Sequence, residues 1–266
     1  MDYEYILLEK KDGIATITLN RPEKLNSFDP QMYEELLLAA TEVSNDDDIR
    51  VAILTGNGRA FSAGADFKRR FQAEIDQKQA GRSNITHKLP NYPMGLTDLT
   101  AVRQPLIAAI NGFAIGVGFN YTLQCDIRIA SEKARIRLPF TQLGQTPEAF
   151  STYYLPRLIG LGKAFELWFT SRWIEAEEAL SIGLVNKVVP ADQLMDSAYE
   201  MAAAIAQNAP TALKLTKRLG YLGLGTDINA ARHFENFAQD YAYGRDDFKE
   251  AVAAFAEKRD PVFTGQ

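Results

Sequence analysis

Residues 105–120, PLIAAINGFAIGVGFN, contain the pattern that decides the fold. Pro105 to Ile110 is a continuous apolar run of the length typical of a strand buried on both faces. Asn111-Gly112 favours a turn, and further glycines at 116 and 118 keep bulky side chains out of the chain's path. A helix over Phe119–Cys125 is expected to follow. A buried strand, a glycine-rich turn and a helix predict an α/β unit.

On the N-terminal side, the same kind of unit is predicted. Two strands, over residues 5–9 and 13–19, flank an Asp12-Gly13 turn. A helix then begins at Asp29-Pro30, where an acceptor side chain precedes proline at the first helical position. Its apolar residues recur every three or four positions as far as Asn45. The apolar run 51–55 predicts a further buried strand.

On the C-terminal side, short strands are expected and then mainly helices. Residues 68–100 are irregular and polar, which is typical of a functional lid or binding loop. The expected strands cover residues 127–130, 134–138 and 184–189, and the later helical patterns cover residues 191–207, 210–222 and 226–257. The sequence therefore predicts an α/β protein with a helical C-terminal appendage. Aromatic residues of the helical part, such as Tyr153 and Phe165–Phe169, are expected in the core.

The composition excludes several classes of protein. The 266 residues are 46% hydrophobic and 24% charged, which is typical of a globular chain. A net charge of −5 does not indicate a general nucleic-acid or membrane-surface binder. The single cysteine, Cys125, makes an intrachain disulfide impossible. With only one cysteine and two histidines, a metal cluster is not expected. Without a signal peptide or an apolar run of about 18 residues, the chain is expected in the cytoplasm or an organelle matrix.

Two glycine-containing loops are candidates for chemistry. The first, GRAFSAGADF at 58–67, follows a buried strand, and its small residues would let a ligand approach the backbone. The second is the turn within 111–120. Two such loops at the ends of neighbouring strands could form an oxyanion hole from main-chain N–H groups. Plain strand-to-helix turns are the alternative interpretation. A dinucleotide-type turn fits less well, because the G-x-G-x-x-G spacing is missing.

The third candidate segment is LPFTQLGQTPEAFST, residues 138–152. Pro147 marks a turn into a helix, so Glu148 places a carboxylate within an otherwise apolar stretch. Such a carboxylate could act as a catalytic acid or base. Alternatively, it could simply be an acidic residue that interacts favourably with the start of a helix.

Together these segments resemble the crotonase (enoyl-CoA hydratase/isomerase) superfamily. The resemblance rests on ITLNRPEKLNSFD, ILTGNGRAFSAGADFKR, PLIAAINGFAIGVG, LQCDIRIAS and FAEKRDPVF, and covers nearly the whole chain. It implies an α/β spiral of strand-strand-helix units over residues 1–200 and a helical trimerisation region over 201–266. It also implies acyl-coenzyme A substrates and a homotrimer or dimer of trimers. The implied oxyanion donors are the amides of Ala65 and Val117.

The acid and base groups distinguish members of this family. The resemblance places Asn120 and Phe140 where enoyl-CoA hydratases carry their two glutamates. LPFTQLGQTPEAFST is instead similar to peroxisomal-type 3,2-trans-enoyl-CoA isomerases, which implies Glu148 as the catalytic residue. One carboxylate can remove a proton from C2 and return it to C4, whereas hydration is easiest with two acids.

The resemblance also implies which residues bind the substrate, and it implies no cofactor, since coenzyme A is part of that substrate. Phe255 and Lys258 would reach a neighbouring subunit's nucleotide, although Lys258 could equally be a solvated cation at a helix end. No nucleic acid or membrane partner is expected. The implied binding residues are Lys24, Ala63, Gly64, Ala65, Asp66, Phe67, Lys68, Gly116, Asn120, Phe140, Phe255 and Lys258.

The leading hypothesis is therefore an isomerase of 3-enoyl-CoA esters. The alternatives are another crotonase reaction on an acyl-CoA, such as hydration, hydrolysis or decarboxylation, and a non-catalytic acyl-CoA-binding scaffold. Retention of both loops together with Glu148 argues against the scaffold, which has no need of an acid at that position.

Overall fold

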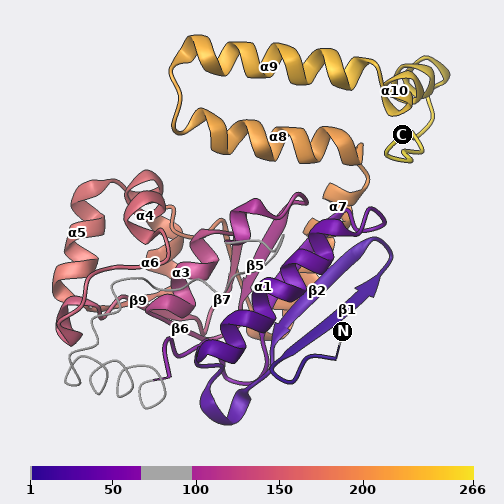
Figure 1. Cartoon of the computed structure of the whole chain (residues 1–266). Coiled ribbons are helices and arrows are strands. Elements are labelled where there is room, and N and C mark those ends of the chain that lie inside the picture. Colours follow the sequence, from indigo (N-terminus) through magenta and orange to yellow (C-terminus); the bar gives the residue numbers. More distant parts are fainter. Residues whose placement is uncertain (1, 67–97) are drawn as a thin grey trace.

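The computed structural model describes residues 2–66 and 98–266, whose strands form two sheets (Figure 1). The larger sheet has the order β1-β2-β3-β5-β7-β10, and the smaller has the order β4-β6-β8-β9. Only the pairs β1–β2 and β8–β9 are antiparallel among these neighbours. The strands are β1 (Ile6–Lys11), β2 (Ile14–Leu19), β3 (Val51–Gly56), β4 (Ala60–Ser62), β5 (Leu106–Ile110), β6 (Phe113–Ile115), β7 (Ile127–Ser131), β8 (Arg135–Arg137), β9 (Trp173–Glu175) and β10 (Lys187–Val189).

Successive strand pairs repeat one arrangement. In β3–β4, β5–β6 and β7–β8, the first strand joins the larger sheet and the second joins the smaller one. The helix α1 (Pro30–Asn45) follows β1–β2, and α3 (Val117–Leu123) follows β5–β6. The chain therefore advances by one strand in both sheets with each unit, as a spiral of strand-strand-helix units requires. Because parallel strands end at the same edge, the loops after β4 and β6 become neighbours.

The apolar runs of the larger sheet are continuous because helices or other buried elements cover both of its faces. Ile53 and Ile107 pack with Leu194 and Ala198 of α7 (Leu194–Ala206), on one face. The alternate residues, such as Leu54, join the main core cluster with α1 on the other face. The predicted start of α1 is confirmed, since Asp29 accepts a hydrogen bond of 2.9 Å from the amide of Met32.

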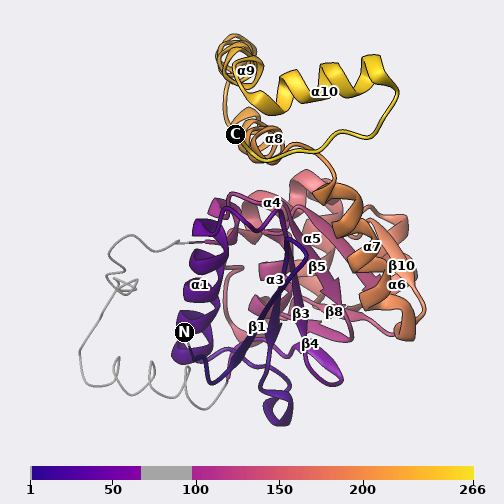
Figure 2. The same cartoon turned by 90° about the vertical axis from the view of Figure 1, so that its right-hand side faces the viewer.

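The remaining helices lie beyond the two sheets (Figures 1 and 2). A C-terminal arm of three helices stands away from the sheets, and these helices bury only Pro210, Ala238, Asp247 and Ala254. Tyr221 and Lys217 attach the arm to the core through Asp126, by contacts of 2.8 and 2.9 Å. The later helices are α4 (Ser151–Ile159), α5 (Leu161–Thr170), α6 (Ala176–Ser181), α8 (Pro210–Gly223), α9 (Ile228–Tyr243) and α10 (Asp246–Glu257).

Several expectations need correction. The pattern 226–257 is two helices, which separate at Gly244, and α3 begins at Val117 rather than Phe119. The short strands β4, β6 and β9 were not predicted, because they lie in segments that were interpreted as loops or as part of the helical region. Phe165 and Phe169 are 41% and 68% exposed on α5, where they stack on each other rather than joining the core.

Two further expectations bear on domains and membranes. The proposed division at residue 200 stays a prediction, and α7 crosses it. Within the ranges 2–66 and 98–266, no helix has the length and apolar character needed to cross a membrane.

Candidate active site

The first candidate loop follows β4, and its backbone is pinned against residue 28. The amide of Phe28 donates to the carbonyl of Gly64 at 2.7 Å, and the amide of Asp66 donates to the carbonyl of Phe28 at 2.8 Å. Phe28 and Ala65 are therefore bridge partners in parallel orientation. Since N–H groups alternate along an extended chain, the amide of Ala65 points away from Phe28. Gly64 has a φ of 88°, which glycine adopts without strain.

Hydrogen bonds and ion pairs of buried polar side chains hold this loop in place. Ser62 Oγ donates to the carbonyl of Asn26 at 2.7 Å and accepts from the amide of Gly64 at 3.1 Å. Arg21, with only 5% of its side chain exposed, donates to Asp66 at 3.3 Å and to Asp29 at 3.2 Å. These contacts link the polar loop after β2 to the Ala65 loop, so the segment is a preorganised structure and not a loose turn.

The second candidate loop ends where α3 begins. Gly116 has φ 52° and ψ −126°, a conformation that favours glycine, and its amide donates to the carbonyl of Arg137 at 2.8 Å. Val117 is the first residue of α3, so its N–H has no partner within the helix. All seven residues of α3 are buried.

The two loops lie against each other. A Cβ on Gly64 would come within 2.8 Å of the carbonyl oxygen of Ile115, and one on Gly118 within 2.5 Å of the Ser62 side chain. The ring centroids of Phe28 and Tyr121, from the two sides of this junction, are 4.7 Å apart. Among the described residues, neither the amide of Ala65 nor that of Val117 has a hydrogen-bond acceptor. Two main-chain donors on neighbouring loops are what an oxyanion hole requires.

Glu148 lies in the turn before α4, and this turn is held from α3. Asn120 Nδ2 donates to the carbonyl oxygen of Glu148 at 2.9 Å, and Gln124 Nε2 donates to that of Ala149 at 3.2 Å. Ala149 and Phe150 have φ values of 51° and 61°, and such left-handed residues cost about 1 to 3 kcal/mol each when they are not glycine. Two consecutive left-handed residues thus directly follow the candidate catalytic carboxylate.

The two positions that would carry hydratase acids are both buried in the described structure. Asn120 is fully buried on α3, and its Oδ1 has no hydrogen-bond partner among the described residues. Phe140, 3% exposed, belongs to the main core cluster. Neither residue can transfer a proton as a carboxylic acid does.

Eight of the residues expected to bind the substrate fall into three groups. Ala63, Gly64, Ala65, Asp66 and Gly116 are part of the two adjoining loops. Lys24 is exposed at the end of a short 3-10 helix, Pro22–Lys24. Phe67 and Lys68 lie outside the described residues.

Phe255 and Lys258 are not brought to this site within one chain. Both belong to the end of α10, which lies across the molecule from α3 (Figures 1 and 2). Phe255 is 88% exposed, and Lys258 adopts a left-handed conformation at the C-terminal cap of the helix. Their implied contact with a neighbouring subunit stays a prediction.

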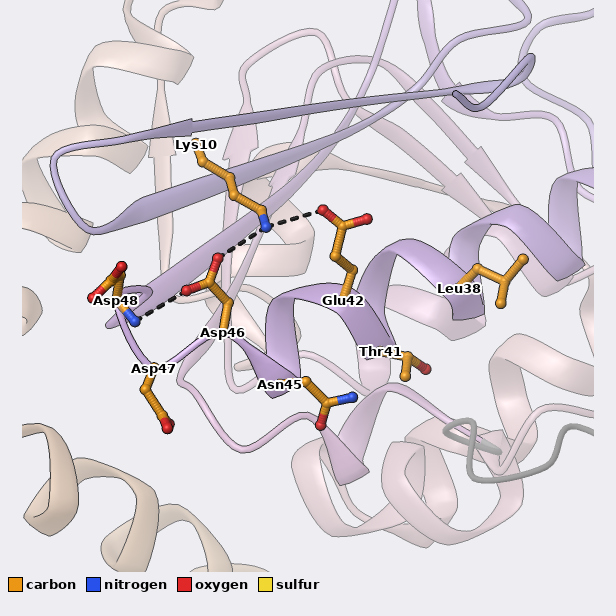
Figure 3. Close-up of a pocket in the computed structure, with 8 residues that line it drawn as sticks. All are labelled: Lys10, Leu38, Thr41, Glu42, Asn45, Asp46, Asp47 and Asp48. Carbon is orange, nitrogen blue, oxygen red and sulfur yellow. Dashed lines mark hydrogen bonds and ion pairs between the residues drawn. The ribbon is translucent and has the colours of Figure 1, made fainter. Parts of the chain in front are cut away.

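Two cavities in the described structure lie elsewhere. One, of about 600 Å³, is bordered by α1 and its following turn, where Lys10 reaches between Glu42 and Asp46 (Figure 3). The other, of about 1170 Å³, is lined by β1, β2, α7 and residues 260–263 of the C-terminal tail. Neither is lined by a residue of the two loops or of the Glu148 turn.

Cys125 is not a candidate nucleophile. Burial raises the pKa of the Cys125 thiol to about 12, so at neutral pH the sulfur is not a thiolate nucleophile. Within residues 2–66 and 98–266, no group of three or more histidine, cysteine, aspartate or glutamate side chains is placed to hold a metal ion.

The supporting residues Arg21, Ser62 and Gln124 were not predicted from the sequence. In the sequence, residues 20–26 indicate only a polar loop that contains a proline. No sequence signal pairs Arg21 with Asp66. The Asn120 and Gln124 spacing of four places both on one helix face, which was the available clue.

Comparison with known proteins identifies the family to which this chain is similar. A family model described as "Enoyl-CoA hydratase/isomerase" matches residues 9–266. The short-chain-enoyl-CoA hydratase of Clostridium acetobutylicum is 40% identical over 260 residues, which are 97% of each chain. The crotonyl-CoA hydratase of Syntrophomonas wolfei is 36% identical over 266 residues, covering 99% of each chain. The crystal structure of an enoyl-CoA hydratase from Bacillus anthracis superposes with a TM-score of 0.87 at 35% identity, covering 99% of this chain and all of the other.

Proposed function

The chain belongs to the enoyl-CoA hydratase/isomerase family, and we propose that it moves a carbon–carbon double bond of an enoyl-CoA ester from C3 to C2. The reaction removes a proton from C2 and produces a dienolate whose charge collects on the thioester oxygen. The amides of Ala65 and Val117 would donate hydrogen bonds to that oxygen. Each such donor contributes about 3 to 4 kcal/mol in comparable sites.

The observation that carries the proposal is the link between Glu148 and α3. The turn that bears Glu148 is hydrogen-bonded to Asn120, three residues after Val117 on the same buried helix. A carboxylate on this turn is thereby tied to the element that supplies one oxyanion donor. This arrangement supports Glu148 as the single acid and base.

Glu148 alone can carry out both proton transfers of the reaction. The Glu148 carboxylate takes the C2 proton, and the C2–H electron pair becomes part of the dienolate. Protonated Glu148 then returns the proton to C4, the double bond settles between C2 and C3, and the thioester carbonyl re-forms. No water and no second acid is consumed.

Hydration is the second candidate, and the names of similar proteins favour it. The relatives from Clostridium acetobutylicum and Syntrophomonas wolfei are both named hydratases. Hydration of a 2-enoyl thioester needs activation of a water and delivery of a proton to C2. Asn120 and Phe140 do neither, so Glu148 would have to do both.

The proposal extends to substrate binding and to the oligomeric state. The loop Ala63–Lys68, with Lys24 and Gly116 near it, would bind the coenzyme A portion. We propose a homotrimer or a dimer of trimers in which Phe255 and Lys258 reach the nucleotide bound by a neighbouring subunit. The exposed position of α10 supports this role.

A pair of substrates tests the assignment. With a 3-enoyl-CoA ester, we expect growth of the conjugated thioester absorbance. With crotonyl-CoA, loss of that absorbance should be slower by at least about 10²-fold, the smaller contribution of a general acid or base. Hydration as fast as isomerisation would overturn the isomerase proposal in favour of a hydratase. Absence of both activities would favour another acyl-CoA reaction or a binding scaffold.

A further inference from the structure

We propose that Asn120 is a positioning residue, which holds the Glu148 turn at a fixed place relative to the Val117 amide. This inference rests on the proposed function, because it assigns Glu148 the catalytic role. It concerns a side chain that is neither acid nor base and that acts through the backbone of another residue.

The contact itself is well defined. The Asn120 side chain is fully buried, and its Nδ2 donates to the carbonyl oxygen of Glu148 at 2.9 Å. The amide of Ser151 donates to the same oxygen at 3.1 Å. A carbonyl oxygen accepts two hydrogen bonds, so these two donors fill its capacity.

The turn needs this support from outside. Ala149 and Phe150 are consecutive left-handed residues without being glycine. Such a conformation persists only where surrounding contacts hold it. Gln124, four residues after Asn120, donates to the carbonyl of Ala149 at 3.2 Å and accepts from the amide of Leu99 at 3.0 Å. Two carboxamides from one helix face thus bind two successive carbonyl groups.

The same helix, α3, also positions the proposed oxyanion donor, the amide of Val117. The amide of Asn120 donates to the carbonyl of Gly116 at 3.0 Å, across the turn that begins at Val117. The oxyanion donor and the anchor of the base turn therefore share one short, buried element. Because reacting atoms must be placed to within about 1 Å, loss of the anchor should lower turnover and leave binding intact.

The donor character of Asn120 matters more than its shape. Oδ1 is buried with no partner in the described part of the chain, so only the Nδ2 side of the carboxamide contributes a hydrogen bond. The substitution Asn120→Asp would place a carboxylate oxygen against the carbonyl oxygen of Glu148. That contact is repulsive until the new carboxylate is protonated and can donate.

The experiment compares Asn120→Ala and Asn120→Asp with wild type and with Thr122→Val. Thr122 is a buried neighbour on α3 whose hydroxyl donates to the carbonyl of Phe119. We expect kcat to fall about 10- to 100-fold in Asn120→Ala with KM within about twofold, on the scale of a 1 Å misplacement. Thr122→Val should lose stability only, with kcat unchanged. Equal losses in kcat and in substrate binding, or unchanged kcat, would overturn the proposal.

Two readouts separate positioning from a merely structural role. The ratio of kcat in Asn120→Asp to kcat in wild type should rise as pH falls, because the protonated side chain regains a donor. The double variant Asn120→Ala/Glu148→Gln should be no slower than Glu148→Gln alone, since an anchor without its base has nothing to position. A flat ratio or additive losses would contradict the proposal.

Amide hydrogen exchange distinguishes failure of this inference from failure of the proposed function. Exchange across residues 146–155 should be faster in Asn120→Ala than in Thr122→Val, whichever reaction the enzyme catalyses. If wild type hydrates and does not isomerise, the isomerase proposal fails and the kcat ratios are measured on hydration. Unchanged exchange at 146–155 would overturn the anchoring role by itself.

Discussion

The guanidinium of Arg21 donates to the carboxylate of Asp66 over 3.3 Å, one residue beyond Ala65. The same group donates to Asp29 over 3.2 Å and lies 4.7 Å from the centre of the Tyr5 ring. A single buried cation therefore ties the start of α1 to the loop that carries a candidate oxyanion donor. The geometry of that loop therefore depends on a side chain from the segment between β2 and α1.

Replacing Arg21 with methionine should destabilise the protein by about 3 kcal/mol or more, because breaking a buried ion pair leaves buried carboxylates less well compensated. Denaturant unfolding measures this change. Arg135→Met is the control, since the Arg135 and Glu175 side chains are 41% and 60% exposed. Its cost should stay below about 1 kcal/mol. Equal costs for both variants would show that Arg21 is not a special support.

Glu148→Gln should lower isomerisation by at least about 10²-fold, because the amide has the shape of the acid but cannot accept the C2 proton. Affinity for a saturated acyl-CoA, measured by calorimetry, should be unchanged, since only the transition state loses a contact. Glu177→Gln, at an exposed position of α6, should keep full activity. A Glu148→Gln enzyme that keeps more than a tenth of wild-type kcat would exclude Glu148 as the base.

The Lys10 ion pairs beside α1 predict a pH-dependent stability (Figure 3). Hydrogen bonds from Lys10 lower the pKa of both Glu42 and Asp46. Carboxyl groups with depressed pKa values stabilise the fold above their unfolded values of 4.5 and 3.8, and this stabilisation is lost as pH falls through their folded values.

Lys10→Met should therefore cost about 0.2 to 1 kcal/mol at pH 7, since these pairs are partly exposed. The difference from wild type should shrink as the pH falls below about 4, in denaturant titrations at several pH values. Lys249→Met removes a pair on α10 whose two side chains are each 70% exposed, so its effect should be smaller than that of Lys10→Met at every pH. A Lys10→Met difference that stays constant to low pH would contradict the assignment.

The C-terminal arm predicts an oligomer. Phe237 on α9 and Phe255 on α10 are 75% and 88% exposed, while α8 to α10 bury only four residues. Large apolar surfaces of this kind mark contacts with another chain. Sedimentation velocity should show a trimer or hexamer, and Phe237→Glu should shift the population toward monomer. A stable wild-type monomer at micromolar concentration would refute the prediction.

Local sequence patterns predicted much of the scaffold. The apolar run of β5, the Asp29-Pro30 start of α1 and the glycines around α3 each depend on contacts within a few residues, so their structures follow from local rules. The same locality explains the errors. A single glycine, Gly244, was too weak a signal to divide the pattern 226–257 into two helices. Phe165 and Phe169 are exposed and stack on each other, but in the sequence they cannot be distinguished from aromatic residues of the core.

By itself, the sequence determined which residues could carry the chemistry, namely two loops with small residues and a carboxylate after proline. Only the tertiary structure decided what holds them. The contacts Arg21 to Asp66 and Asn120 to Glu148 join residues 45 and 28 positions apart. Neither contact leaves a periodic pattern in the two segments that it joins. The first pairs two side chains that are distant in sequence. The second uses a backbone carbonyl, which any residue supplies. Such contacts arise only when the packed sheets bring the segments together.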